Sequence, residues 1–189
     1  GGAASLNGGN AWISVSNFPK ASGGKTTGSA WVKANSAPVW ASILKNWALG
    51  PGELHLGLDN GSGRLSIYTT QSNRGIIGPV IDGSSFSLGV WQYVTFVADG
   101  AAVHLYLNGA EVGTPAAYNG TLMTTLPCLG IGAKPNDTCT GADPGFPGFW
   151  NGLIDEARIF NTNLSAGRIA TDYNNQSSPG TFYTVGAQE

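Results

Sequence analysis

Two adjacent carboxylates, Asp155 and Glu156, lie inside a stretch whose alternation otherwise predicts a β-strand over residues 153–160. Strands disfavour aspartate and burial disfavours an unpaired charge, so both positions need a compensating partner. We expect a bound cation for one carboxylate, and Arg158 or solvent for the other. Acceptance of backbone N–H groups remains the alternative for Asp155. The chemistry indicated here is coordination or hydrogen bonding by oxygen atoms.

Catalytic carboxylates are much harder to find in the sequence. Glycoside hydrolysis requires two carboxyl groups about 5–5.5 Å or 6.5–9.5 Å apart. Glu53 and Asp59 share strand parity but would lie about 20 Å apart on an extended chain. Asp155 and Glu156 are neighbours and would face opposite sides. There is no Gly-x-Ser-x-Gly elbow, and neither histidine lies in a catalytic motif. We therefore expect no enzyme.

Polar and aromatic side chains alternate with aliphatic ones along two predicted hairpins. Carbohydrate sites combine flat aromatic faces with planar polar groups. Period-two alternation puts residues such as Leu56 and Leu105 in the core. The outward-facing candidates for sugar binding are then His55, Arg64, Tyr68, His104 and Tyr106. An ordinary solvated sheet face is the equally strong alternative.

The six tryptophans divide into two groups. Trp12, Trp31 and Trp91 occur in strand patterns and are predicted to be core residues. The other three, Trp40, Trp47 and Trp150, flank loops. Aromatic residues exposed on loops often serve a ligand or partner, which adds Trp47 and Trp150 to the candidate sugar-binding residues. They could instead cap the open ends of a sandwich.

The elements that must position these side chains are short strands separated by turn clusters, which is the pattern of an all-β sandwich. Hairpin turns are predicted at residues 59–63 and 99–102. One helix is predicted over residues 166–173, with Ser165 as its N-cap. There is no repeat, linker or composition break, so we expect one domain over residues 1–189. The predicted strands cover residues 11–15, 28–34, 40–45, 53–58, 64–69, 91–98, 103–107, 111–113, 129–132 and 153–160.

Composition restricts the possible partners. Only 11% of residues are charged, the formal net charge is −2, and 29 glycines supply many turns. No run of basic residues is present, so we expect no nucleic-acid partner. No apolar stretch reaches the 18 or so residues of a membrane span, so we expect no membrane insertion. Gly1-Gly2-Ala3-Ala4 has no signal-peptide character, which suggests a mature or excised module.

The two cysteines, Cys128 and Cys139, flank a loop-rich segment. A disulfide between them is predicted, which favours an oxidising compartment. Two free thiols are one alternative. A metal site is the other, although both histidines lie far away along the chain.

Several segments, in this order, carry a family resemblance. They are residues 5–13, the run Ser29-Ala30-Trp31-Val32-Lys33, residues 90–96 and 105–109 of the central hairpin, and Phe149 to Phe160. Together they resemble laminin-G-like, concanavalin A-like lectin-glucanase jelly rolls of the bacterial secreted type. The resemblance implies a two-sheet antiparallel jelly-roll β-sandwich with one short C-terminal helix. It says little about ligand, because this fold has many functions.

The resemblance also implies a structural calcium ion that ties the first strand to the last. Its ligands would be Asp155 from the closing strand, with Asn7 and Asn10 from the opening turn. The family more often has Asp at the position of Asn7, so this site would have one charge fewer. Alternatively, Asp155 only accepts backbone N–H bonds or pairs with Arg158.

The function predicted from the sequence is a non-catalytic carbohydrate-binding module of a secreted or cell-surface protein. Its partners would be a polysaccharide or glycan and other domains of a larger chain. The second hypothesis is a calcium-dependent adhesion or protein-interaction module, which the same motifs would serve. The third is a glycan-active hydrolase or lyase with an unfamiliar set of residues.

Overall fold

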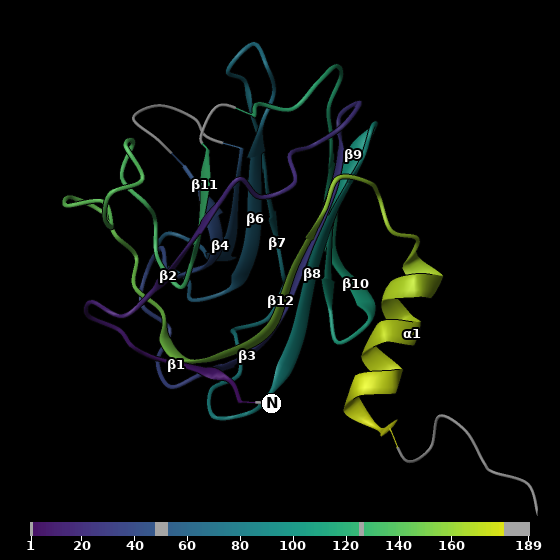
Figure 1. Cartoon of the computed structure of the whole chain (residues 1–189). Helices are drawn as coiled ribbons and strands as arrows, with labels where there is room; N and C mark the ends of the chain where they lie inside the picture. The colour runs from purple at the N-terminus through teal and green to yellow at the C-terminus, as the bar shows by residue number, and fades with distance from the viewer. Residues whose placement is uncertain (1, 48–52, 125–126, 180–189) are drawn as a thin grey trace, which may run out of the picture.

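The computed structural model describes residues 2–47, 53–124 and 127–179. Two antiparallel six-stranded sheets pack face to face (Figure 1). The first sheet has the order β1 (Ala4–Asn7), β12 (Asn151–Phe160), β3 (Lys25–Ala34), β8 (Gln92–Asp99), β9 (Ala102–Leu107) and β10 (Ala110–Ala117). The second has the order β2 (Ile13–Ser16), β11 (Cys128–Ile131), β4 (Ser42–Asn46), β5 (Leu54–Leu58), β6 (Leu65–Thr70) and β7 (Ile76–Ile81). The predicted jelly-roll sandwich is confirmed.

The core lies between the sheets and follows the predicted alternation. Leu56 and Ile67 of the second sheet are fully buried, as are Phe96 and Leu105 of the first. Leu56 pairs with Ile67 across β5 and β6, so their side chains share the inner face. Residues of the opposite parity point out of the sandwich.

Strands β1 and β7 were not predicted as strands in their own right. The Gly78-Pro79 pair argues against a strand, because proline cannot donate to a hydrogen-bonded ladder. Both β1 and β7 are edge strands, where one side of the backbone has no neighbour in the sheet. Proline is tolerated at such edges.

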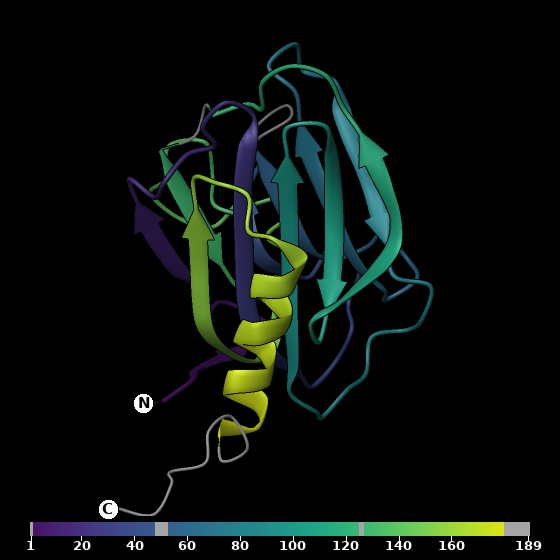
Figure 2. The same cartoon turned by 90° about the vertical axis from the view of Figure 1, so that its right-hand side faces the viewer.

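Helix α1 (Ala166–Ser177) lies in front of the outer face of the first sheet and runs roughly along its strands (Figure 2). Ser165 caps it as predicted, its side chain accepting the backbone N–H of Arg168. Ile169 is buried beneath the helix in a small cluster with Tyr93, Val97 and Tyr106 of the sheet. The first sheet is therefore apolar on both sides where the helix covers it.

Two tryptophans lie in the opposite environment to the one predicted. Trp150 is fully buried in the core and packs edge-on against Phe86. Trp91 is 40% exposed. Trp31 lies outside the main core; it packs against the small cluster beneath α1 and stacks on Tyr173 of that helix. Alternation gave the face of each strand position, but it could not show that a loop tryptophan turns inward.

The predicted disulfide between Cys128 and Cys139 is present. It ties β11 to the loop that follows it. Among the described residues, no helix is long and apolar enough to cross a membrane.

Candidate functional site

A row of three polar side chains crosses the outer face of the second sheet. Lys45 on β4 pairs with His55 on β5, and His55 pairs with Tyr68 on β6. Their inner-face neighbours are leucine and isoleucine, so the parity of the strands directs this row away from the core.

Trp40 precedes β4 and extends this row. Its ring centroid lies 5.4 Å from that of His55 and 5.5 Å from that of Tyr68. Its backbone has a φ of 59°, a left-handed conformation that is rare for a bulky residue. The turn is held from both sides: Ser42 Oγ donates to the Trp40 carbonyl, and Gly148 packs so closely that a Cβ there would lie 2.3 Å from the same oxygen. Such backbone strain is typical of functional sites.

These residues line a cleft of about 360 Å³, which we call the β4–β6 cleft. This volume lies within the usual range for sites that bind small molecules. Its other walls come from loops, and Phe146 among them is 77% exposed. The complete lining is Trp40, Lys45, Trp47, His55, Tyr68, Ile76, Lys134 and Phe146.

His55 is only 1% exposed. Burial lowers its pKa well below the ordinary value, nearby Lys45 lowers it further, and a hydrogen bond to the Leu58 carbonyl opposes both effects. The ring is therefore neutral at pH 7, and Nε2 donates to Leu58 O over 3.3 Å. The other ring nitrogen, Nδ1, is buried without a hydrogen-bond partner in the described part of the chain.

Lys45 is 6% exposed. Burial lowers its pKa from 10.5 to about 7; Lys134 lowers it further and Asp143 acts in the opposite direction. Lys134 is neutralised by Asp143, with 2.8 Å between Nζ and Oδ2. The Lys45 ammonium lies 5.4 Å from the centre of the Trp40 ring, and among the described residues no carboxylate lies within ion-pair distance of it.

Three of the predicted sugar-binding residues, Trp47, His55 and Tyr68, meet in the β4–β6 cleft. Arg64 does not line it; its Nε donates to Ser62 Oγ in the turn before β6. The cleft therefore joins one predicted loop aromatic to two predicted strand residues.

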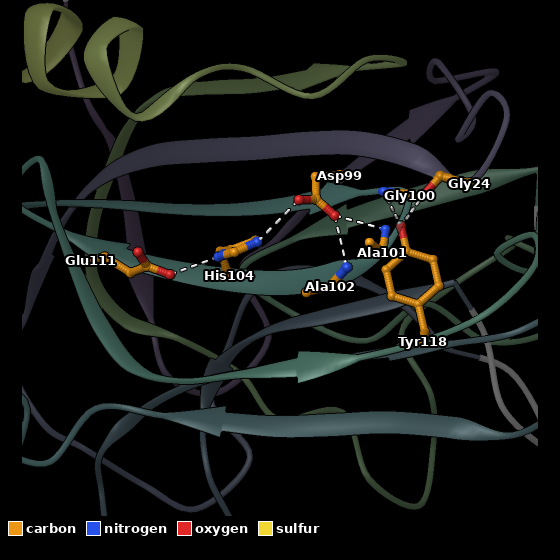
Figure 3. A network of polar contacts seen from close by, with 8 residues as sticks. All are labelled: Gly24, Asp99, Gly100, Ala101, Ala102, His104, Glu111 and Tyr118. Carbon is orange, nitrogen blue, oxygen red and sulfur yellow. Dashed lines mark hydrogen bonds and ion pairs between the residues drawn. The ribbon is translucent and has the colours of Figure 1, made fainter.

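His104 and Tyr106 lie on the other sheet. His104 sits between two carboxylates, with Nδ1 2.6 Å from Glu111 and Nε2 3.3 Å from Asp99 (Figure 3). Tyr106 points out of the core as predicted, but α1 covers it and leaves it 7% exposed. The expectation that its ring faces solvent is wrong, because alternation cannot show what packs on the outer face.

Trp150 needs a similar correction. It was expected to flank a loop and to be available to a ligand, but its side chain is fully buried between the sheets. Trp150 directly precedes β12, which begins at Asn151, and this position at the start of the strand places its side chain in the core.

The three residues predicted to hold calcium do not form one donor set. Asn7 pairs with Asn151 of β12, whereas Asp155 lies four residues, or about 13 Å, further along β12, where it pairs with Trp31.

The polar atoms of these three residues are also occupied by other contacts. Asn7 Oδ1 already accepts the backbone N–H groups of residues 9, 10 and 11. Asn10 Oδ1 accepts the Asn7 side-chain amide. Asp155 accepts the N–H of Glu156, which in turn pairs with Arg158. These residues do not fit a shared cation.

A second cleft, of about 630 Å³, lies between β12, β3 and α1; we call it the α1 cleft. Trp31, Trp91 and Asp155 line it. Most of its polar groups are already paired: Trp31 Nε1 donates to Gln176, and Arg158 pairs with Glu156. Asn175 Oδ1 is buried and has no hydrogen-bond partner among the residues that the structure describes.

Sequence reasoning missed Lys45 and Lys134, and it did not select Trp40 or Phe146. Lys45 could have been found, because it lies two residues before Trp47 and so shares its strand parity. Lys134, Trp40 and Phe146 come from loops or turns, and no periodicity places those on a sheet face.

A family model described as the concanavalin A-like lectin/glucanases superfamily matches residues 7–170. The chain belongs to this superfamily. The predicted resemblance is thereby confirmed. No relative was found among curated proteins.

Several solved structures are similar to this chain in fold, at low sequence identity. Domain 4 of AbnA, a GH43 extracellular arabinanase from Geobacillus stearothermophilus in complex with arabinotriose, has a TM-score of 0.69 at 21% identity and covers 89% of this chain and 75% of that one. A putative carbohydrate binding protein from Bacteroides ovatus has a TM-score of 0.65 at 13% identity, covering 88% and 47%. A SAP-like pentraxin from Limulus polyphemus has a TM-score of 0.63 at 16% identity, covering 89% and 80%.

Proposed function

We propose that this chain is a non-catalytic carbohydrate-binding module of a secreted or cell-surface protein, and that sugar binds in the β4–β6 cleft. The observation that carries the proposal is the group of three rings, Trp40, His55 and Tyr68, with a lysine beside them that has no ion-pair partner in the described part of the chain. Pyranose and furanose rings present C–H faces that pack on aromatic surfaces, while their hydroxyls need polar groups at the edge. The cleft offers both.

Two further observations support the non-catalytic and extracellular parts of the proposal. The described lining of the β4–β6 cleft contains no Asp or Glu, whereas most glycosidases need two carboxyl groups at the scissile bond. The Cys128–Cys139 disulfide is of a kind that persists in oxidising compartments. The arabinotriose complex of AbnA domain 4 is an example of a sugar bound by this fold.

The test is a glycan array followed by affinity electrophoresis in gels containing the polysaccharides that bind. Tyr68→Ala and Trp47→Ala should each weaken binding roughly 5- to 30-fold, equivalent to about 1–2 kcal/mol, because each removes an aromatic face. Trp91→Ala is the matched control, since it removes an exposed tryptophan from the α1 cleft instead.

The outcomes separate the alternatives. Loss of binding in Trp91→Ala with no change in Tyr68→Ala would move the site to the α1 cleft. If no polysaccharide binds, an adhesion or protein-interaction module becomes the better hypothesis. If a polysaccharide is cleaved, and one carboxylate substitution abolishes the cleavage, the chain is an enzyme.

A further inference from the structure

Not every charge around the β4–β6 cleft has a paired counter-ion. Two lysines line it, and Asp143 compensates one of them, Lys134, in a salt bridge whose side chains are 11% and 13% exposed. Asp59 lies near Tyr68 but does not line the cleft, and it already accepts the Ser62 hydroxyl and the backbone N–H of Arg64. Lys45 is therefore the cation of this cleft that has no paired anion among the described residues.

A buried, unpaired amine is costly to the fold, because desolvation disfavours its charged form. A carboxylate placed against Lys45 would restore the charged form in an environment where the pair attracts strongly. The surroundings of Lys45 therefore favour a negatively charged ligand group at the edge of the aromatic surface.

The rings restrict which carboxylate fits. Trp40 lies within 5.4 Å of the Lys45 ammonium and also contacts His55 and Tyr68. A ligand that uses the whole cleft would therefore have a C–H face for the rings and an acidic group at one end. A sugar ring with a directly attached carboxylate, a uronic acid, has this shape.

We propose that the β4–β6 cleft recognises an acidic sugar, with Lys45 as the counter-ion of the sugar carboxylate. This inference depends on the proposed function, since it names the class of glycan for the same cleft. Lys45 sets specificity, and Trp40 and Tyr68 supply the surface shared by acidic and neutral sugars, with the buried His55 ring packed against both.

The proposal predicts a characteristic pH dependence. The pKa of Lys45 is about 7 in the free protein because it is buried. A sugar carboxylate stays ionised above about pH 4.5. Affinity should therefore fall as pH rises from 6 to 9, and at pH 8 binding should take up a proton. Neighbouring His55 stays neutral in this window because its pKa is well below the ordinary value. Burial alone would raise the pKa of Asp143, but Lys134 and two backbone N–H groups together hold it below the ordinary value.

The experiment compares oligogalacturonate, oligomannuronate and oligoglucuronate of one length with their carboxyl-reduced neutral forms, by titration calorimetry. At least one oligouronate should bind at least tenfold more tightly than its reduced form at pH 6, and this preference should shrink by pH 9. Proton uptake is measured by repeating the titration at pH 8 in two buffers of different ionisation enthalpy. Acetate should not compete, because it lacks the ring.

Two variants complete the design. Lys45→Met should remove the preference for the acidic form and the proton uptake, while any binding of the neutral form survives. Lys25→Met, an exposed lysine of the first sheet, removes the same charge far from the cleft and should change neither.

Three outcomes would overturn the proposal: equal affinity for acidic and neutral forms, a preference that survives in Lys45→Met, or the same loss in Lys25→Met. Strong competition by acetate would reduce the site to a simple carboxylate site. Binding of neutral glycans without an acidic preference would reject this inference and leave the proposed function intact. Failure of every glycan on the array would reject the proposed function itself.

Discussion

At the scale of single residues, the β4–β6 cleft contains a side chain whose environment works against the stability of the fold. Lys45 is almost fully buried beside Lys134, and both burial and the second lysine oppose its charge. Burial also keeps His55 neutral, so it does not add a further cation at neutral pH. Burying this amine in the cleft therefore lowers the stability of the folded protein.

We expect Lys45→Met to stabilise the free protein, and to do so more at pH 6 than at pH 10. The folded-state pKa of Lys45, about 7, lies below the ordinary 10.5, so between these values the unfolded chain binds the proton more strongly. Wild-type stability therefore gains from this residue as pH rises through that window. Because each pKa unit corresponds to about 1.4 kcal/mol, the advantage of Lys45→Met should be larger at pH 6 by at least about 1 kcal/mol.

Urea unfolding of both proteins at the two pH values measures this difference. Other titrating groups, such as Glu53, whose burial raises its pKa to about 7, are present in both proteins and cancel in the comparison. An advantage of the variant that does not change with pH would show that Lys45 is not held in a desolvated site.

Asn7 is a second residue whose side chain has a specific structural role. Its Oδ1 organises the turn after β1 by accepting three backbone N–H groups. Asn7→Ala should lower the free energy of unfolding by about 1–2 kcal/mol, because these donors lose their acceptor. Asn7→Asp keeps the acceptor and should retain most of the stability.

Melting curves of these variants, recorded with calcium and with a chelator, also address the cation predicted from the sequence. We expect the loss in Asn7→Ala to be the same under both conditions, since the turn is stabilised by hydrogen bonds. A larger loss in calcium would indicate that Asn7 ligates the ion.

At the scale of elements, helix α1 converts the outer face of the first sheet into a second apolar layer. Ile169 is 1% exposed against Tyr93, Val97 and Tyr106. The second sheet has no helix on it in the described part of the chain, and its outer face holds the β4–β6 cleft. The two outer faces therefore differ in structure: a helix covers one, and the other is open at the cleft.

Ile169→Ala should therefore cost about 2–4 kcal/mol of stability and leave glycan affinity unchanged. The matched control is Ile13→Ala, because Ile13 is 41% exposed on β2 and should lose little. Denaturant unfolding measures the first effect and calorimetry the second. Weakened binding in a still-folded Ile169→Ala protein would place the helix in the binding site.

At the scale of the whole molecule, the disulfide and the cleft belong to one loop system. Cys139 anchors the loop after β11 to Cys128, and that loop presents Lys134, whose partner Asp143 comes from the next turn. The strands supply the core independently of this connection. Closing the loop covalently positions one wall of the cleft.

Replacing both cysteines by serine should lower stability by about 3 kcal/mol in the chain-entropy model and should not unfold the sandwich. Binding should weaken as well, because the Lys134 wall is no longer fixed. Mass spectrometry should find no free thiol in the native protein. Alkylation of either cysteine without reduction, or full affinity in the double serine variant, would contradict this coupling.

The sequence by itself determined which way each strand residue points. Alternation put Leu56 and Leu105 in the core and His55, Tyr68 and Tyr106 on outer faces, because that periodicity is a local property of extended backbone. The family motifs determined the sandwich, and the cysteine spacing indicated the disulfide. Strand β7 was not predicted, because its sequence contains a proline. Proline is tolerated in an edge strand, but the position of a strand at the edge depends on the whole sheet.

Only the tertiary structure decided what covers each outer face. Helix α1, distant in sequence, buries Tyr106, whereas the turn at Trp40 packs on Tyr68 and leaves a cleft beside it. Trp150 turned inward and Asn7 lay far from Asp155 because strand register, not strand pattern, sets those positions. Such contacts join residues far apart along the chain, and no local periodicity encodes them.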